Sequence, residues 1–509
     1  MNNLNPGSYQ LANTDYDIAA PRADAMIHSL RAIGYDISTA LADLVDNSIS
    51  AGSKNIWIEF YWSGESSTIA VIDDGLGMSE STLLNAMRLG SRSPLEMRSD
   101  SDLGRFGLGL KTASFSQCKM LTVGSKTAEG QLNFRCWDLD YVQNCGEWRL
   151  LRHASDPFQQ ASARLNALQS GTVVFWENID RLVEGTDTNS QGDQDLFLAQ
   201  AANVARHLGM VFHRFIDRPN TLKIHINNQR AVAWDPFLSA ESATQILTEE
   251  AHSIFGKTIT VRPYVLPHHS KISEKLYRAA EGPAGWNAQQ GFYVYRGQRL
   301  LSAGDWLNLQ GIRKEEHFKL ARILIDIPNS LDGEWEIDIK KSRATPPVRL
   351  RAHLLRIAKV TRQAASGIYS HRGTKLIVSG SDVIPMWGKK VSHGLISYHI
   401  SRDHPLVKNL LSMGGVVRRK TEALLGIIEE TVPVPMIMID SAENPDKHAK
   451  PFAGRDESAI TAVLRETYES LRQQGNSRNE ALIILSSLDP FQHYPQLLAS
   501  MPDFNDGAH

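Results

Sequence analysis

Asp43 and Asn47 lie four residues apart in a segment, residues 40–52, whose spacing predicts an amphipathic helix that ends at a glycine. Side chains at i and i+4 share one helix face, so the carboxylate and the carboxamide can reach the same point. A carboxylate can activate water, and a carboxamide oxygen is a ligand for a hard cation such as Mg²⁺. Taken alone, the pair also fits an ordinary solvated helix face. The apolar stripe consists of Leu41, Leu44, Val45 and Ile49.

A second motif follows two predicted strands, residues 56–61 and 67–72. It reads Asp-Asp-Gly-Leu-Gly-Met at residues 73–78, and its glycines allow the backbone to approach a flat ligand. Asp73 can accept a hydrogen bond from an exocyclic amine such as that of adenine. Because Asp-Asp-Gly is also common in tight turns, this motif does not identify a binding site by itself.

The third motif is a glycine-rich stretch, Gly-Arg-Phe-Gly-Leu-Gly at residues 104–109, which leads into a predicted helix. Such a loop presents backbone N–H groups and a positive helix end to phosphates. It does not match the P-loop, because Leu110 separates Gly109 from Lys111, and its glycines run in the reverse order to the dinucleotide fingerprint.

Together these motifs resemble those of the GHKL ATPase superfamily, which includes gyrase B, MutL, histidine kinases, the ninety-kilodalton heat-shock chaperones and the MORC proteins. A fourth segment, residues 171–175, is similar to the later Gly-Thr strand of the superfamily. The four segments follow the order of the family across residues 40–176. The branch with the most similar motifs is MORC, through Leu-Val-Asp-Asn at 44–47, Asp-Asp-Gly at 73–75 and Gly-Leu-Lys at 109–111.

The resemblance implies an α+β fold that begins with a GHKL (Bergerat) ATP-binding sandwich and uses Mg²⁺. It implies that Asp43 activates or orients water and that Asn47 holds Mg²⁺. The same resemblance assigns contacts with ATP to Asn47, Asp73, Gly75, Gly77, Met78, Gly104, Phe106, Gly107, Leu108, Gly109, Lys111 and Thr172.

Asp43 departs from the family pattern, because most of the superfamily has Glu at this position. Aspartate is one methylene shorter, and a misplacement of about 1 Å can cost roughly a hundredfold in rate. We therefore expect an ATPase that converts ATP to ADP and phosphate, with slow turnover.

The composition of the whole chain is that of an ordinary globular protein with about three domains: 509 residues, of which 42% are apolar. The formal net charge is −2, so any nucleic-acid site must be local. Cys118, Cys136 and Cys145 are odd in number and too far apart for a zinc cluster, which favours a reducing compartment. The sequence begins without a signal-peptide pattern and has no membrane span, so we expect a cytoplasmic protein.

Shifts in composition suggest four parts. We expect an ATP-binding domain over residues 1–180, with a lid at about 79–109, and a transducer-like α/β domain over residues 196–345. A basic, mostly helical segment at residues 346–440 and C-terminal helices at residues 457–509 would follow. The transducer assignment places there a helix at 196–215 and strands at 222–226, 258–265, 291–296 and 322–327.

In the related ATPases a transducer lysine reaches the γ-phosphate. The matching place is the loop after Ile327, where Lys341 is the first choice and Lys340 the second. Both could equally be solvated lysines.

Residues 340–375 hold ten Lys or Arg and no Asp or Glu. After Pro347 the spacing predicts a helix with an inward stripe of Leu350, Leu354, Ile357 and Thr361. A neighbouring basic face could neutralise phosphates of a duplex without reading its sequence, or could simply be solvated. The candidate DNA-binding residues are Arg349, Arg356, Lys359 and Arg362.

The resemblance implies a homodimer that forms on Mg²⁺-ATP binding and clamps or remodels DNA. Prokaryotic relatives of this type are associated with restriction-like, antiviral DNA defence alongside helicase and nuclease partners. Two alternatives stay open: an ATP-dependent chaperone, which would need exposed apolar surface, and a nucleotide sensor that dimerises with little hydrolysis.

Overall fold

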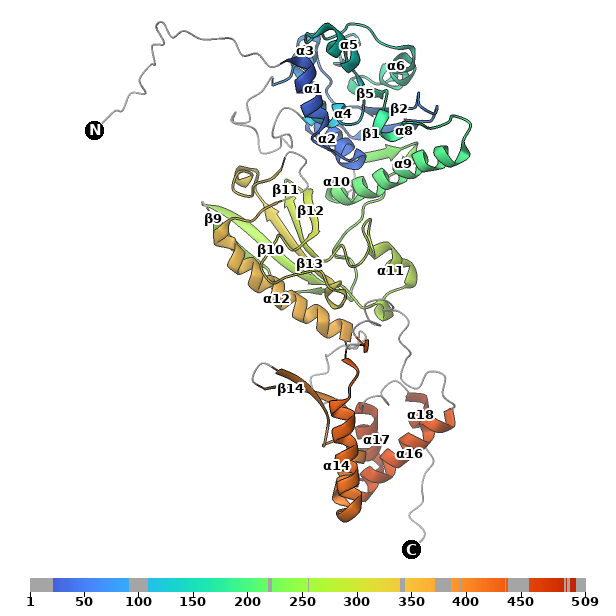
Figure 1. Cartoon of the computed structure of the whole chain (residues 1–509), viewed down its shortest axis with the longest axis vertical. Helices are drawn as coiled ribbons and strands as arrows, with labels where there is room; N and C mark the ends of the chain where they lie inside the picture. The colour runs from blue at the N-terminus through green and yellow to red at the C-terminus, as the bar shows by residue number, and fades with distance from the viewer. Residues whose placement is uncertain are drawn as a thin grey trace, which may run out of the picture. The chain divides into compact units, whose positions relative to one another are not determined.

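The computed structural model describes residues 22–90, 109–217, 222–254, 256–338, 344–370, 386–392, 395–434, 436–437, 457–488, 491 and 495–499. The chain divides into two compact units, Met1–Thr374 and Lys375–His509. The first unit holds two mixed β-sheets with their helices, and the second holds a hairpin and a group of helices (Figure 1). Every helix in this described part is too short or too polar to cross a bilayer.

The first sheet has seven strands in the order β4-β3-β5-β2-β1-β6-β7. All neighbours are antiparallel except β1 and β6, which run parallel. Successive side chains of a strand point to opposite faces, so Ile69 and Val71 enter one core while Ala70 and Ile72 enter another. The strands are β1 Asn55–Tyr61, β2 Thr68–Asp73, β3 Met120–Lys126, β4 Asn133–Asp138, β5 Gly171–Glu177, β6 Lys223–Ile226 and β7 Gln229–Arg230.

Helices cover both faces of this sheet. The larger core lies under α1, α2, α4 and α9, and the smaller one under α6 and α7. The helices of this domain are α1 Ala23–Arg31, α2 Ile37–Ser50, α3 Glu80–Met87, α4 Gly109–Phe115, α5 Leu139–Cys145, α6 Asp156–Ala161, α7 Ala163–Ala167, α8 Asp180–Val183, α9 Gln191–Val211 and α10 His213–Ile216.

Helix α2 is the predicted motif helix, and its two ends have identifiable causes. The side chain of Asp36 accepts a hydrogen bond from the backbone N–H of Thr39 at 3.0 Å, which caps the first turn. Gly52 adopts a φ of +73° just beyond the last turn, a conformation that glycine reaches without strain. The predicted stripe is buried at Leu41, Leu44 and Val45, and Ile49 packs against the same core.

The second sheet has the strand order β12-β11-β13-β10-β8, with β9 paired to β10. Helix α12, Val348–Ser370, packs on β10 and β13 through its predicted stripe, of which Leu350, Leu354, Ile357 and Thr361 are all buried. The remaining elements are β8 Gln245–Ile246, β9 Glu250–Ile254, β10 Lys257–Val265, α11 Glu274–Ala280, β11 Gly291–Arg296, β12 Arg299–Asp305 and β13 Ala321–Ile327.

The boundaries of these domains differ from the expected ones. Helix α9 and strand β6 were expected in the transducer-like domain, but α9 packs on α2 and β6 pairs with β1. Ile224 and Ile226 of β6 are buried in the first core, which therefore extends well beyond residue 180. The expected segment 346–440 is also divided, because α12 belongs to the second sheet and the hairpin and helices after residue 386 lie in the second unit.

The second unit begins with an antiparallel hairpin that the sequence analysis did not predict. Two of its predicted helices are present, at α16 and α17, where a capping box between Ser477 and Glu480 starts α17. The elements are β14 Trp387–Ser392, β15 Leu395–Ile400, α13 Pro405–Ser412, α14 Gly415–Glu430, α16 Glu457–Gln473, α17 Arg478–Ser487 and α18 Pro495–Ala499.

Candidate active site

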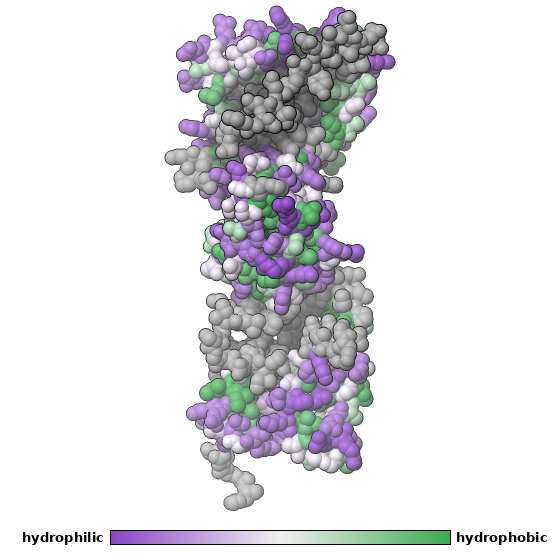
Figure 2. Space-filling model, turned by 90° about the vertical axis from the view of Figure 1, so that its left-hand side faces the viewer, coloured by the Kyte–Doolittle hydropathy of each residue, from purple (hydrophilic) through white to green (hydrophobic). Residues whose placement is uncertain are grey.

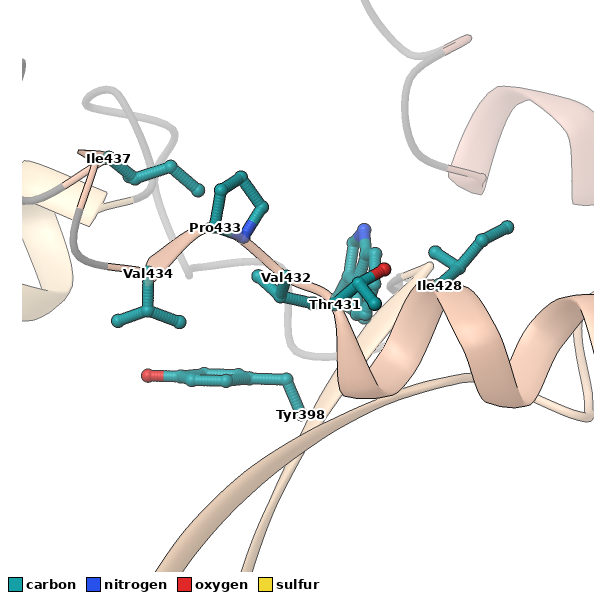
Figure 3. Close-up of a pocket in the computed structure, with 8 residues that line it drawn as sticks. Tyr398, Ile428, Thr431, Val432, Pro433, Val434 and Ile437 are labelled. Carbon is teal, nitrogen blue, oxygen red and sulfur yellow. The ribbon is translucent and has the colours of Figure 1, made fainter.

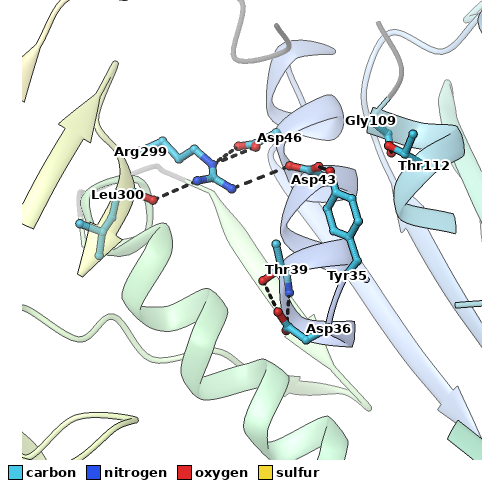
Figure 4. Close-up of polar contacts among 9 residues, drawn as sticks. All are labelled: Tyr35, Asp36, Thr39, Asp43, Asp46, Gly109, Thr112, Arg299 and Leu300. Carbon is cyan, nitrogen blue, oxygen red and sulfur yellow. Dashed lines mark hydrogen bonds and ion pairs between the residues drawn. The ribbon is translucent and has the colours of Figure 1, made fainter. Parts of the chain in front are cut away.

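The helix motif places its two polar residues in different environments. Asp43 is buried, with 3% of its surface exposed, and its Oδ2 accepts a hydrogen bond from the Tyr35 hydroxyl at 3.0 Å (Figure 4). Asn47, one turn further along α2, is exposed. The carboxylate is therefore fixed in position, whereas the carboxamide can meet a ligand from solution.

The Tyr35 hydroxyl donates the hydrogen bond that holds the Asp43 carboxylate. Burial, together with the Asp43 carboxylate and its hydrogen bond, raises the pKa of Tyr35. The phenol therefore stays protonated at neutral pH and acts as a donor to Asp43. Thr112 of α4 lies beside the same hydroxyl (Figure 4).

Asp73, at the end of β2, is tied to the helix motif. Its Oδ2 accepts a hydrogen bond from Ser48 Oγ of α2 at 2.9 Å, and its Oδ1 accepts one from the Gly75 N–H at 3.0 Å. Burial raises the pKa of Asp73, and these hydrogen bonds offset part of the rise. Two motifs that are 26 residues apart, counted from Asn47 to Asp73, thus meet through Ser48.

The glycine turn after Asp73 packs tightly against β3 and β5. Gly77 has a φ of +69°, and a Cβ atom there would lie 1.9 Å from the carbonyl oxygen of Lys126, so only glycine fits. The Met78 N–H donates to Ser125 Oγ at 2.8 Å, and Ser125 Oγ lies 2.8 Å from Thr172 Oγ1. Ser125 therefore links the predicted turn to the predicted Gly-Thr strand.

The end of the glycine-rich motif lies beside Asp43. A Cβ atom on Gly109, the first residue of α4, would be 3.8 Å from Asp43 Oδ2. The structure thus brings the helix motif and the described end of the glycine-rich motif together. Gly104, Phe106, Gly107 and Leu108 lie outside the described residues, as do Lys340 and Lys341.

Lys111 occupies a different place from the one expected for a phosphate ligand. Its side chain is buried, and its ammonium donates hydrogen bonds of 2.8 Å to the carbonyl oxygens of Ala86 and Arg88 at the end of α3. Burial lowers the pKa of Lys111 to about 8. A direct phosphate contact would require the ammonium to leave these two carbonyl groups.

Arg299 is a site residue that the sequence analysis missed. It comes from β12 in the second sheet, and its Nε lies 2.9 and 2.8 Å from the two carboxylate oxygens of Asp46. Its Nη2 lies 4.0 Å from Asp43 Oδ1 (Figure 4). All three side chains are almost fully buried. No local pattern could connect residues that are 253 positions apart.

The loop that follows β13 also lies near this site, through Asp338. The charge of Asp338 contributes to the raised pKa of Tyr35, which places it within electrostatic range of the phenol. Asp338 is the last described residue before the two candidate lysines.

The candidate DNA residues of α12 are placed in two environments. Arg349, Arg356 and Lys359 are exposed, and Arg356 forms an ion pair with Glu250. Arg362 requires a correction, because it is 9% exposed, pairs with Glu315 at 2.9 Å and lies 3.8 Å above the Phe318 ring. At Arg362 the surface of α12 is covered by Glu315 and Phe318, so this guanidinium is not exposed to a DNA phosphate.

Comparison with known proteins agrees with this geometry. Residues 35–172 match the family model described as histidine kinase-, DNA gyrase B- and HSP90-like ATPase. The ATPase morc-1 of Caenorhabditis elegans is 31% identical over 88 residues. That alignment covers 17% of this chain and about a tenth of the length of the relative.

These findings define the class of the first domain: it is a GHKL-type ATPase domain. Within that class it is similar to the domain of a MORC ATPase.

Proposed function

We propose that this protein is a Mg²⁺-dependent ATPase that dimerises on ATP binding and uses the dimer to clamp or remodel DNA within a prokaryotic DNA-defence system. The observation that carries the proposal is the convergence of Asp43, Asp73 and Gly109 around α2, with Asn47 exposed beside them. Three motifs that are separate in sequence thus lie beside one another, which supports one shared site.

The residues present suit Mg²⁺-ATP chemically. Asn47 offers a hard oxygen ligand one helical turn from the buried Asp43 carboxylate. Asp73 offers a hydrogen-bond acceptor beside the turn at Gly77, where only glycine fits. Among the described residues no three His, Cys, Asp or Glu side chains gather into a metal site. The metal assignment therefore rests on Asn47 together with phosphate oxygens of the nucleotide. Bound Mg²⁺ would neutralise charge that develops on those phosphates.

Each residue then has a defined role. Asp43 orients or deprotonates the attacking water, and Tyr35 keeps its carboxylate in place by donating a hydrogen bond. Asp73 with Thr172 holds adenine. The backbone N–H groups of residues 104–109 and a lysine, Lys341 or Lys340, stabilise the phosphates.

The proposed DNA surface is the exposed face of α12 that carries Arg349, Arg356 and Lys359. Its support is the charge balance of residues 340–375, which contain ten basic and no acidic residues. The ion pair of Arg356 with Glu250 is surface-exposed, and such pairs are weak enough to exchange for a phosphate.

A nucleotide sensor with little hydrolysis is the second candidate, and one observation favours it. The Asp43 carboxylate already accepts a hydrogen bond from Tyr35 and lies 4.0 Å from the Arg299 guanidinium, so both of its oxygens have protein neighbours in the place of an attacking water.

ATP turnover with and without duplex DNA separates these functions. Stimulation by DNA supports the clamp, and tight binding with negligible turnover supports the sensor. Stimulation by an unfolded protein instead of DNA would contradict both and indicate a chaperone.

A further inference from the structure

Helix α14 in the second unit presents an apolar stripe to solvent. The apolar residues of this stripe follow one another at spacings of seven or eight and then three or four residues, so they share one helix face. Leu425 lies on another face of the helix and is buried against the hairpin and α13. Figure 2 shows hydrophobic residues at the surface of this unit. The α14 stripe is 39–62% exposed and consists of Val416, Val417, Leu424, Ile427 and Ile428, with Lys420 between Val416 and Leu424 on the same face.

The two ends of the stripe have complementary shapes. At the C-terminal end it borders a pocket of about 630 Å³, whose lining includes Ile428, Thr431, Tyr398, Val434 and Ile437 (Figure 3). At the N-terminal end Met413 is 58% exposed just before the helix begins, next to Val416 and Val417. One end therefore has an apolar hollow, and the other has apolar side chains that project.

The two ends of α14 also carry opposite charges. Arg418, Arg419 and Lys420 lie in the N-terminal half, and Glu429 and Glu430 lie in the last turn. This order opposes the helix dipole, which favours acidic residues at the N-terminus and basic residues at the C-terminus. Within the described residues, Arg418 and Glu429 have ion-pair partners, Glu422 and Arg402, but no ion pair of the structure includes Arg419 or Glu430.

We propose that the α14 stripe binds the α14 stripe of a second copy of this chain, antiparallel, about a two-fold axis near Leu424. This arrangement sets the Arg419 end of each helix against the Glu430 end of the other. It also directs Met413 and Val417 of each copy towards the pocket of its partner.

A second copy of this chain accounts for both the charges and the shape of α14. A two-fold interface uses the same surface twice, so each feature must find its complement on the other side of the axis. Charge and shape both reverse along α14, from basic to acidic and from projection to pocket. An unfolded client or a membrane surface would match the apolar residues but would have no reason to match the reversed charges.

Sedimentation velocity of the full chain without nucleotide tests the interface. We expect a dimer that is held together by α14 before ATP joins the two ATPase domains, and Leu424→Glu should shift the nucleotide-free chain to monomer while its circular dichroism stays unchanged, because Leu424 is 58% exposed. The matched control is Ile483→Glu on α17, which is 68% exposed and outside the stripe and should stay dimeric. A monomeric wild type, or a dimer that Leu424→Glu does not alter, overturns the proposal.

A mixing experiment tests the antiparallel arrangement. Arg419→Glu and Glu430→Arg should each weaken self-association at least tenfold, because each homodimer would contain two like-charge contacts. An equimolar mixture should dimerise again, because both contacts of the mixed dimer are then between opposite charges. Failure of the mixture to recover overturns the arrangement. Since nucleotide is absent, neither result depends on the proposed ATPase function.

Discussion

At the scale of single residues, Asp46 and Arg299 form the most consequential pair in the first unit. Their ion pair is almost fully buried and joins α2 of the ATPase domain to β12 of the second sheet. A buried pair adds little net stability compared with apolar residues, but the loss of one partner leaves an uncompensated charge. The pair therefore fixes the relative position of two elements that both border Asp43.

We predict that Arg299→Met destabilises the protein by about 3–5 kcal/mol, because it leaves the Asp46 carboxylate buried without its partner. The double variant Arg299→Met with Asp46→Leu should recover much of this loss. Urea denaturation of both variants measures the difference. Equal destabilisation in the single and double variants would show that the charge of Asp46 is not the cause.

Asp73→Asn should weaken ATP binding at least about tenfold, because the acceptor that we propose for the adenine amine becomes a donor. Asn47→Ala should abolish the Mg²⁺ dependence of binding. Calorimetric titration with ATP, with and without Mg²⁺, measures both effects. Asp140→Asn, on the surface of α5, is the control and should bind as the wild type does. Wild-type binding by the Asp73 and Asn47 variants would remove the pocket assignment.

At the scale of elements, the motif-bearing segments were predictable because local patterns determine them. The spacing in α2, the glycine turn after β2 and the inward stripe of α12 each followed from a repeat of apolar residues or from a glycine requirement. Which sheet a strand joins is a different question. The sequence pattern of β6 would suit a strand of either domain. Its pairing with β1 joins residues that are more than 160 positions apart in the chain.

The candidate site follows the same division. The motifs predicted Asp43, Asn47, Asp73 and Thr172 as members of the site. Tyr35, Ser48, Ser125 and Arg299 were missed, because a serine or arginine outside a motif gives no sign of its partner. The burial of Arg362 was missed because the face that a helical residue occupies depends on what packs around the helix, here Glu315 and Phe318.

Helix α10 and strand β11 meet through a hydrogen bond of 2.8 Å between His213 Nε2 and the Tyr295 hydroxyl. Burial lowers the pKa of His213 to about 4, so the folded protein keeps this ring neutral. In the unfolded chain the His213 ring takes up a proton near pH 6.5. The contribution of the neutral, buried ring to the free energy of unfolding is therefore fully present above pH 6.5 and is lost as the pH falls towards 4. The full loss is about 3 kcal/mol.

We therefore predict that the urea midpoint of the wild type falls between pH 7.5 and pH 5. His213→Gln should show a shallower fall, because glutamine can bond to the hydroxyl but does not titrate. Parallel slopes for the two proteins would contradict the assignment to His213.

At the scale of the whole molecule, we expect DNA affinity to depend on nucleotide. Two chains joined at their ATPase domains would bring two α12 faces together, so DNA should bind more tightly with a non-hydrolysable ATP analogue than without it. Affinity should fall steeply with salt. A gel shift with and without the analogue measures this, and equal affinity in the two states would refute the ATP-dependent clamp.

The α12 face itself is tested by charge reversal. Arg349→Glu, Arg356→Glu and Lys359→Glu together should abolish DNA binding and leave ATP affinity nearly unchanged, because the nucleotide site and this face are separate surfaces. The matched control reverses three exposed cations elsewhere in the second domain, Lys257, Lys275 and Arg278, and should keep DNA affinity within about threefold. Equal losses in both triple variants would show that net charge, not this face, governs binding.

ATP turnover by Asp43→Ala, compared with wild type at saturating Mg²⁺-ATP, tests most directly whether Asp43 is the general base of this ATPase. If Asp43 is the base, this variant should still bind ATP and lose at least about a hundredfold in turnover, the contribution expected of a positioned general base. Asp43→Glu, with the longer side chain usual in the superfamily, should retain measurable turnover. Unchanged turnover in Asp43→Ala would contradict this role, because ATP would then be hydrolysed without the Asp43 carboxylate.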